Sequence, residues 1–142
     1  MRGLTKVAKI AKKGQLGDIY RDEFAELTTL GEEMREAYDN TPESLQSSGV
    51  GEARGAAADT LEGLTEDEVP EAISTLEVDY PFDTKKKPSR SDRRDNAVAA
   101  LSAIVDRLQE DEKVSETHAD FLQGLEELIS EAEGVEFPGM YG

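Results

Sequence analysis

The segment DRRDNAVAALSAIVDRLQED, residues 92–111, has the clearest helical pattern in this chain of 142 residues. Its apolar side chains recur every three or four positions, at Val98, Leu101, Ile104, Val105 and Leu108. That spacing places them on one face of an α-helix, which needs another element to cover it. After a turn at 112–115, a second amphipathic segment at 116–133 predicts this partner helix, and Gly134 suits its C-terminal end. We therefore expect a helical hairpin over residues 93–134.

A second, acidic hairpin is expected over residues 18–79. Asp18 can cap a helix over 18–39, and the apolar residues of this segment follow a heptad-like spacing: Tyr20, Phe24, Leu27, Met34 and Tyr38. Gly31 fills the missing position of the stripe, where a glycine lets another backbone approach closely. A turn at 39–43, a short helix at 42–47 and a helix over 52–64 follow.

The segment after this second helix carries two signals. Thr65 and Glu68 form a capping box for a third helical segment that reaches Leu76. Pro70 either kinks that segment or marks its true start.

The remaining parts of the chain read as arms and a linker. Residues 4–12 predict a short basic amphipathic helix inside an N-terminal arm, 1–17, which ends at two glycines. Residues 80–92 are rich in Lys, Pro and Ser and predict a basic linker, and residues 135–142 predict an extended apolar C-terminal tail. No β-type alternation stands out. The predicted fold is therefore all-α: two helical hairpins joined by a basic linker, with extended N- and C-terminal arms.

Charge is distributed in blocks along the chain. Residues 1–13 hold five cations and no acid, 18–79 have a net charge of −15, 80–94 of +4, and 95–142 of −10. Outside the two basic blocks there is one lysine, a pattern that resembles haloarchaeal proteins adapted to high salt. Charge segregated in this way points to interactions with partners and solvent rather than to chemistry.

Composition limits the functional classes. The chain has no cysteine, so disulfides, thiol nucleophiles and thiolate metal sites are excluded. Its apolar runs are too short to cross a bilayer, and its basic start lacks the apolar core of a secretory signal. His118 is the single histidine, and the Glu66–Glu68 cluster lacks the spacing of a calcium loop. We expect no catalytic residue, cofactor or metal.

The basic segments and the tail are the candidate partner-binding residues. They are Lys6, Lys9, Lys12, Lys13, Lys85, Lys86, Lys87, Arg90, Arg93, Arg94, Phe137 and Tyr141. The cations could clamp nucleic-acid phosphates, or they could pair with acids of this chain or of a second copy. We favour the protein contacts over nucleic acid.

The stretch YDNTPESLQSS, residues 38–48, resembles a helical-hairpin motif of small acidic phage and prophage proteins of unassigned role. In those proteins a helix ends at Asp-Asn, Pro-Glu opens a turn with Leu-Gln, and a second acidic helix follows. The resemblance covers about residues 20–65, and the chain departs from it at Gly55 and Pro70. It implies a viral origin, a helical hairpin and protein–protein contact, with no catalytic residues to transfer.

These observations favour a non-enzymatic structural or assembly protein. It would dock on other viral structural proteins in a multi-subunit virion through its termini and basic loop, with no membrane span, and reside in the virion or the host cytoplasm. The alternative is an acidic DNA mimic that inhibits a host nucleic-acid-binding protein, because carboxylates on helices can imitate the phosphates of a duplex.

Overall fold

The computed structural model describes residues 9–84 and 86–138 of the chain. Its elements, in order, are β1 (Lys9–Gln15), α1 (Leu16–Asp39), a 3₁₀ turn η1 (Glu43–Leu45), α2 (Gly49–Glu62), α3 (Glu71–Ser74), β2 (Glu77–Asp83), α4 (Arg90–Gln109), α5 (Glu112–Thr117) and α6 (Ala119–Glu133). No helix in these residues is long and apolar enough to span a membrane.

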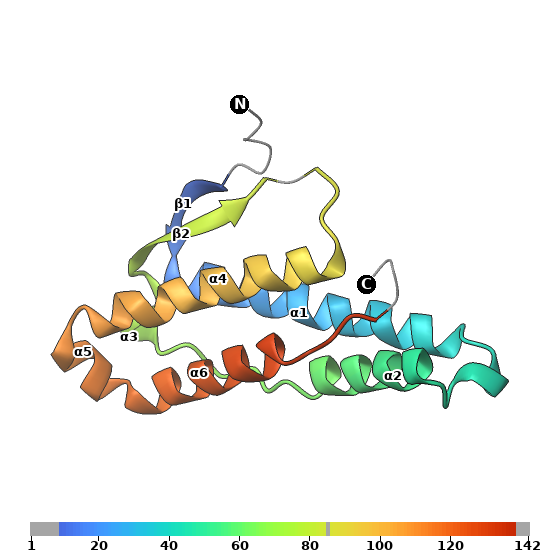
Figure 1. Ribbon diagram of the computed structural model, residues 1–142. Helices are drawn as coiled ribbons and strands as arrows, with labels where there is room; N and C mark the ends of the chain where they lie inside the picture. The colour runs from blue at the N-terminus through green and yellow to red at the C-terminus, as the bar shows by residue number, and fades with distance from the viewer. Residues whose placement is uncertain (1–8, 85, 139–142) are drawn as a thin grey trace.

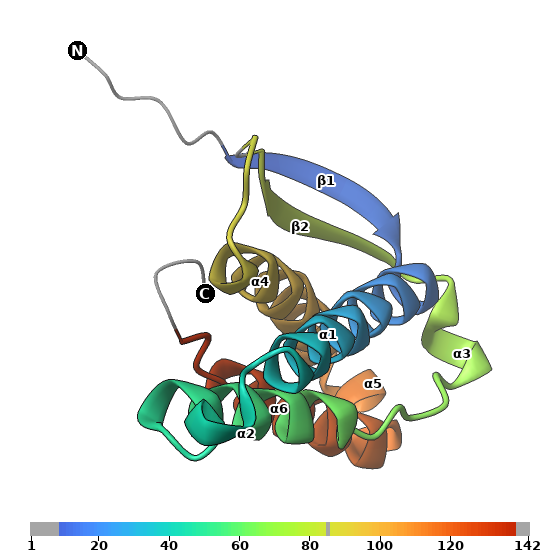
Figure 2. The same cartoon turned by 90° about the vertical axis from the view of Figure 1, so that its right-hand side faces the viewer.

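The elements form three layers (Figures 1 and 2). The antiparallel pair β1–β2, here called the ribbon, lies over α1 and α4, and α2 and α6 lie beneath them. The long helix α1 contacts both α2 and α4, and α4 contacts α6. One continuous apolar core runs through these contacts, so helix burial rather than the ribbon supplies most of the hydrophobic stabilisation.

The predicted long helices are confirmed with small shifts at their ends. The expected 18–39 helix begins at Leu16, and the expected 92–111 helix spans Arg90–Gln109 with a full capping box between Ser89 and Asp92. Gly31 also has the expected role, because a Cβ there would lie 2.9 Å from the Cβ of Leu61. The backbones of α1 and α2 therefore approach more closely than any larger residue allows.

The all-α prediction is wrong, because the structure contains a two-stranded antiparallel sheet. Residues 9–12 of the expected basic helix belong to β1, and the rest of that helix lies outside the described residues. The strand pairs with residues 77–83, more than sixty positions away (Lys9 opposite Asp83, Gln15 opposite Glu77). Such pairing depends on a partner distant in sequence, so the spacing within either segment could not reveal it.

The arrangement of two hairpins around a linker is also corrected. The first four residues of the expected linker 80–92 are in β2, and its last three are in α4. Helix α1 packs against α4 as well as α2, so the two halves share one core. The N-terminal arm is a paired strand from Lys9 onward, and the C-terminal tail is anchored at its start by buried Val135.

Two local predictions fail at helix ends. Residues 64–70 are irregular, so the capping box at Thr65 and Glu68 is absent and α3 begins after Pro70. The expected 116–133 helix is divided at His118, with α5 capped by Asp111 and α6 starting at Ala119. Of the two alternatives left open for Pro70, the structure shows the second. Pro70 immediately precedes the first residue of α3, where its missing N–H costs no helical hydrogen bond.

Candidate functional site

The arginines of the second basic block turn inward onto the acids of α1. Arg93 donates to Glu26 at 2.9 Å and to both carboxylate oxygens of Glu33 at 2.9 Å. Arg90 donates to Glu33 at 3.0 Å. Hydrogen bonds from Arg93, and then from Arg90, hold the pKa of Glu33 below its ordinary value despite partial burial. These two cations join α4 to α1, with their guanidinium groups bonded to carboxylates of the same chain.

Arg94 serves the other side of α4. Its guanidinium donates to the carbonyl oxygens of Ala132 at 2.9 Å and Val135 at 2.8 Å, so it caps the C-terminal end of α6. Its side chain is only 13% exposed, and its Cζ lies 5.5 Å from the centre of the Phe137 ring. Arg94 and Phe137, expected to bind a partner, thus hold the start of the tail to the body.

The lysines lie in different surroundings from the arginines. Lys13 lies 3.8 Å from Glu77 and 3.7 Å from Asp79 on the ribbon, and Lys12 places its Nζ 3.9 Å from the centre of the Phe82 ring. Lys86 and Lys87 are exposed in the loop before α4. Lys9 pairs through its backbone with Asp83. Lys6, Lys85 and Tyr141 lie outside the described residues.

The connection between α1 and α2, residues 42–51, forms what we call the tip. Positions 44–51 read SLQSSGVG and carry no charge, in a chain where 34% of residues are charged. Leu45 is 52% exposed and Val50 is 44% exposed. Burying an exposed aliphatic side chain against another apolar surface is favourable, so this uncharged stretch is a candidate contact surface.

Hydrogen bonds fix the conformation of the tip. Gln46 donates to the carbonyl oxygen of Thr41 at 3.2 Å, and Ser48 accepts from the backbone N–H of Gly51 at 3.2 Å as the cap of α2. A Cβ at Gly51 would collide with the carbonyl oxygens of Leu45 and Gln46. The tip is therefore a hydrogen-bonded turn of defined conformation, and Leu45 and Val50 are exposed on it.

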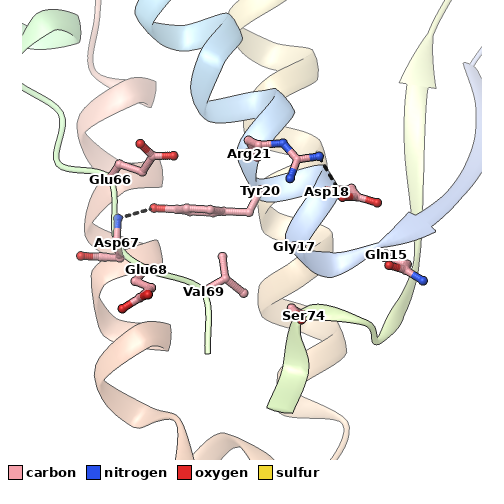
Figure 3. A pocket seen from close by; sticks show the side chains of 10 residues that line it. All are labelled: Gln15, Gly17, Asp18, Tyr20, Arg21, Glu66, Asp67, Glu68, Val69 and Ser74. Carbon is pink, nitrogen blue, oxygen red and sulfur yellow. Dashed lines mark hydrogen bonds and ion pairs between the residues drawn. The ribbon is translucent and has the colours of Figure 1, made fainter. Parts of the chain in front are cut away.

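Two hollows complete the candidate surfaces. An open cleft of 590 Å³ separates the start of α1 from residues 66–69 and is lined by Asp18, Arg21, Glu66, Asp67 and Glu68 among others (Figure 3). Tyr20 crosses it, and its hydroxyl accepts from the backbone N–H of Asp67 at 2.9 Å. In the described parts of the chain no group of three His, Cys, Asp or Glu residues is placed to hold a metal ion. The hydrogen bond between Asp67 and the Tyr20 hydroxyl therefore ties segment 66–69 to α1.

A second hollow, of 380 Å³, lies beneath the end of the ribbon at which Phe82 and Asp83 pair with Ile10 and Lys9. Phe82, Pro88, Glu23 and Glu26 line it, together with Arg93 and further residues of α4 and the loop before it. Glu23 has a pKa raised to about 7, chiefly because it is withdrawn from water and then because Glu26 and Asp22 repel its charge.

Sequence reasoning did not include the tip among the partner-binding residues. The signal was present, since eight consecutive uncharged positions with two aliphatic residues between serines and glycines are unusual in so charged a chain. Comparison of the chain with protein-family models, curated proteins and solved structures finds no match.

Proposed function

We propose that this protein is a non-enzymatic assembly component that docks on neighbouring protein subunits of a virus particle. The observation that carries the proposal is the tip, where Leu45 and Val50 are held in solvent by a hydrogen-bonded turn. Burying them against an apolar surface is favourable, and the rigid turn reduces the conformational entropy lost on binding.

The chemistry of the tip favours a protein partner. Its residues 44–51 have no charge to desolvate, whereas an anionic partner such as nucleic acid would be repelled by the surrounding carboxylates. This revises the docking residues: the tip replaces Arg90, Arg93 and Arg94, whose guanidinium groups are engaged within the chain.

The viral part of the proposal rests on the resemblance described above. The motif that resembles small acidic phage proteins, residues 38–48, supplies the end of α1 and most of the tip. The resemblance implies protein–protein contact, and the tip provides a surface with the chemistry for it.

The test is incorporation into particles. We expect the chain to co-sediment with purified virus at a stoichiometric copy number, measured by quantitative mass spectrometry. The double variant Leu45→Ser with Val50→Ser should be expressed and folded but depleted from particles, whereas Ala119→Ser, an exposed change on α6, should be incorporated normally. Absence of the unaltered chain from particles, or full incorporation of the tip variant, would contradict the proposal.

A second candidate function is supported by the inward-turned arginines. A DNA mimic needs an unbroken negative surface, and the pairing of Arg90 and Arg93 with acids of α1 removes part of the basic interruption. In that case the chain would bind a DNA-binding protein with an affinity that falls steeply with salt and competes with duplex DNA. Tip variants would then bind as well as the unaltered chain, which separates the two candidates.

A further inference from the structure

We propose that the surface which receives the tip is the ribbon end of a second copy of this chain. The ribbon end comprises Ile10, Lys12, Phe82, Lys86 and Lys87. This inference rests on the proposed docking function and names its partner. Copies would then join head to tail, the tip of one against the ribbon end of the next.

The first argument is where the apolar surface is exposed. Ile10, Leu45 and Val50 are the large hydrophobic residues left exposed in the described parts of the chain. Two are on the tip, and Ile10, 46% exposed, lies directly opposite Phe82 in the ribbon. Residues opposite each other in an antiparallel pair share one face, so these two side chains form one apolar patch.

The second argument is the shape of the receiving surface. Phe82 forms a wall of the 380 Å³ hollow beneath the ribbon, which Pro88 also lines. A hollow of this size exceeds the volume of one aliphatic side chain, and its apolar wall is formed by Phe82 and Pro88, while its six other lining residues are polar or charged. The ribbon end therefore offers the exposed aliphatic residues of the tip both a flat apolar patch and a recess beside it.

The third argument is charge complementarity. Exposed carboxylates lie on the tip at Glu43 and next to it at Asp39 and Glu52, and no described ion pair engages them. At the ribbon end, Lys86 and Lys87 are exposed with no described carboxylate partner, and Lys12 contacts a ring rather than an acid. Three acids on one surface and three cations on the other favour one orientation of the two copies.

The two surfaces cannot meet within one copy. The hollow beneath the ribbon is lined by Glu23 and Glu26 in the first half of α1, whereas the tip follows the last residue of this helix. Figures 1 and 2 show the ribbon above α1 and the connection to α2 beyond its far end. A contact between unlike surfaces leaves each copy with one free tip and one free ribbon end, so it propagates into chains or closes into rings.

The experiment is a complementation test by sedimentation velocity on the full chain. The tip variant is Leu45→Ser with Val50→Ser, and the ribbon variant is Ile10→Ser with Lys86→Gln and Lys87→Gln. Because each copy has a net charge of −16, the runs are made at about 0.15 M KCl, where repulsion between copies is largely screened beyond about 8 Å while charges in contact still attract each other. The control Lys113→Glu changes the net charge by as much as the two Lys→Gln changes and lies on α5, away from both surfaces.

The unaltered chain and the control should form a concentration-dependent series of oligomers. Each variant alone should remain monomeric up to concentrations at least about tenfold higher. An equimolar mixture of the two variants should give a dimer and nothing larger, since it contains one intact tip and one intact ribbon end per pair.

Three outcomes would overturn the inference. They are a monomeric unaltered chain under all conditions, assembly that survives in either variant, and a mixture that fails to form the dimer. Circular dichroism spectra matching the unaltered chain exclude misfolding of the variants. If the chain is monomeric but the tip variant is still depleted from virus particles, the docking function stands and only its partner is wrong.

Discussion

At the scale of single residues, Glu23 shows how burial next to like charges changes the behaviour of a carboxyl group. Glu23 lines the hollow beneath the ribbon, near Tyr80 of β2. Glu26 and Asp22 on its own helix repel its negative charge, and the positive charge of Lys12 on β1 offsets only part of this repulsion. Its pKa is raised to about 7 from the ordinary 4.5. Its ionisation therefore opposes folding.

The pH dependence of Glu23 follows from the sign of this shift. The stability it contributes is fully present below about pH 4.5 and is lost as the pH rises through about 7. We expect Glu23→Gln to increase the free energy of unfolding by about 2 kcal/mol at about pH 8 and to change it little at about pH 5. Urea unfolding of both chains at the two pH values measures this difference. Glu32→Gln, an exposed change on the same helix, should show no such dependence, and an equal effect of Glu23→Gln at both pH values would contradict the argument.

Arg93 is the second residue with a quantitative consequence. Its removal leaves Glu26 and Glu33, each about one-third exposed, close together without their shared cation. We expect Arg93→Ala to destabilise the fold by about 2 kcal/mol and Arg93→Lys by about 1 kcal/mol, because lysine cannot form the paired hydrogen bonds. Chemical unfolding measures both changes. The exposed pair of Arg21 with Asp18 gives the comparison, and Arg21→Ala should cost no more than about 0.5 kcal/mol.

At the scale of elements, the close approach of α1 to α2 rests on one glycine and one ion-pair group. Gly31 admits the backbone near Leu61, and Arg35 reaches across to Asp59 and Glu62, with its Nη2 3.0 Å from the latter. The ribbon depends on different contacts. The backbone N–H of Asp83 donates to the amide oxygen of Asn96, and Arg107 donates to the carbonyl oxygen of Glu77, so α4 holds the ribbon from below.

Gly31 and Gly49 form a matched pair for testing the helix contact. Alanine favours a helix over glycine by about 1 kcal/mol, so propensity alone predicts that both Gly→Ala changes stabilise. At position 49 nothing lies within 4 Å of the added methyl group, and we expect a gain of a few tenths of a kcal/mol. At position 31 the methyl group meets Leu61, and we expect a net loss of about 1–2 kcal/mol. Thermal unfolding compares the two, and a stabilising Gly31→Ala would show that α1 and α2 separate easily.

At the scale of the whole molecule, the net charge of −16 opposes compaction. Ion pairs between described residues engage nine carboxylates, fewer than a third of the 32 in the chain, so the acids greatly outnumber the cations that pair with them. In dilute salt the carboxylates repel one another over long distances. Near 0.1 M salt this repulsion is largely screened beyond about 10 Å.

Salt should therefore stabilise this protein. We expect the melting temperature to rise by several degrees, about 5 °C or more, between about 0.05 M and about 1 M KCl. Differential scanning calorimetry measures the shift. Sucrose at equal osmolality, which stabilises by exclusion from the protein surface and not by screening charge, gives the shift that the effect of KCl should exceed. A melting temperature that falls with KCl would mean that the ion pairs between α1 and α4 outweigh the repulsion.

The long helices could be predicted because their evidence is local. Apolar residues at helical spacing, such as Leu101, Ile104 and Leu108, require a buried face wherever the helix lies, and Gly31 interrupts such a stripe only where a backbone comes close. The charge blocks were equally readable. The sequence does not show which groups these cations contact. Whether a lysine or arginine is exposed or paired depends on where the acids of other elements lie in the folded chain.

The amino-acid sequence by itself determined the helical character, the helix faces and the strongly acidic surface, because each depends on residues within a few turns of one another. Tertiary structure alone decided the pairing of β1 with β2, the inward turn of Arg90, Arg93 and Arg94, and the outward display of Leu45 and Val50. The physical reason is that strand pairing, ion pairing and exposure are relations between distant segments, and only the packed chain brings those segments together.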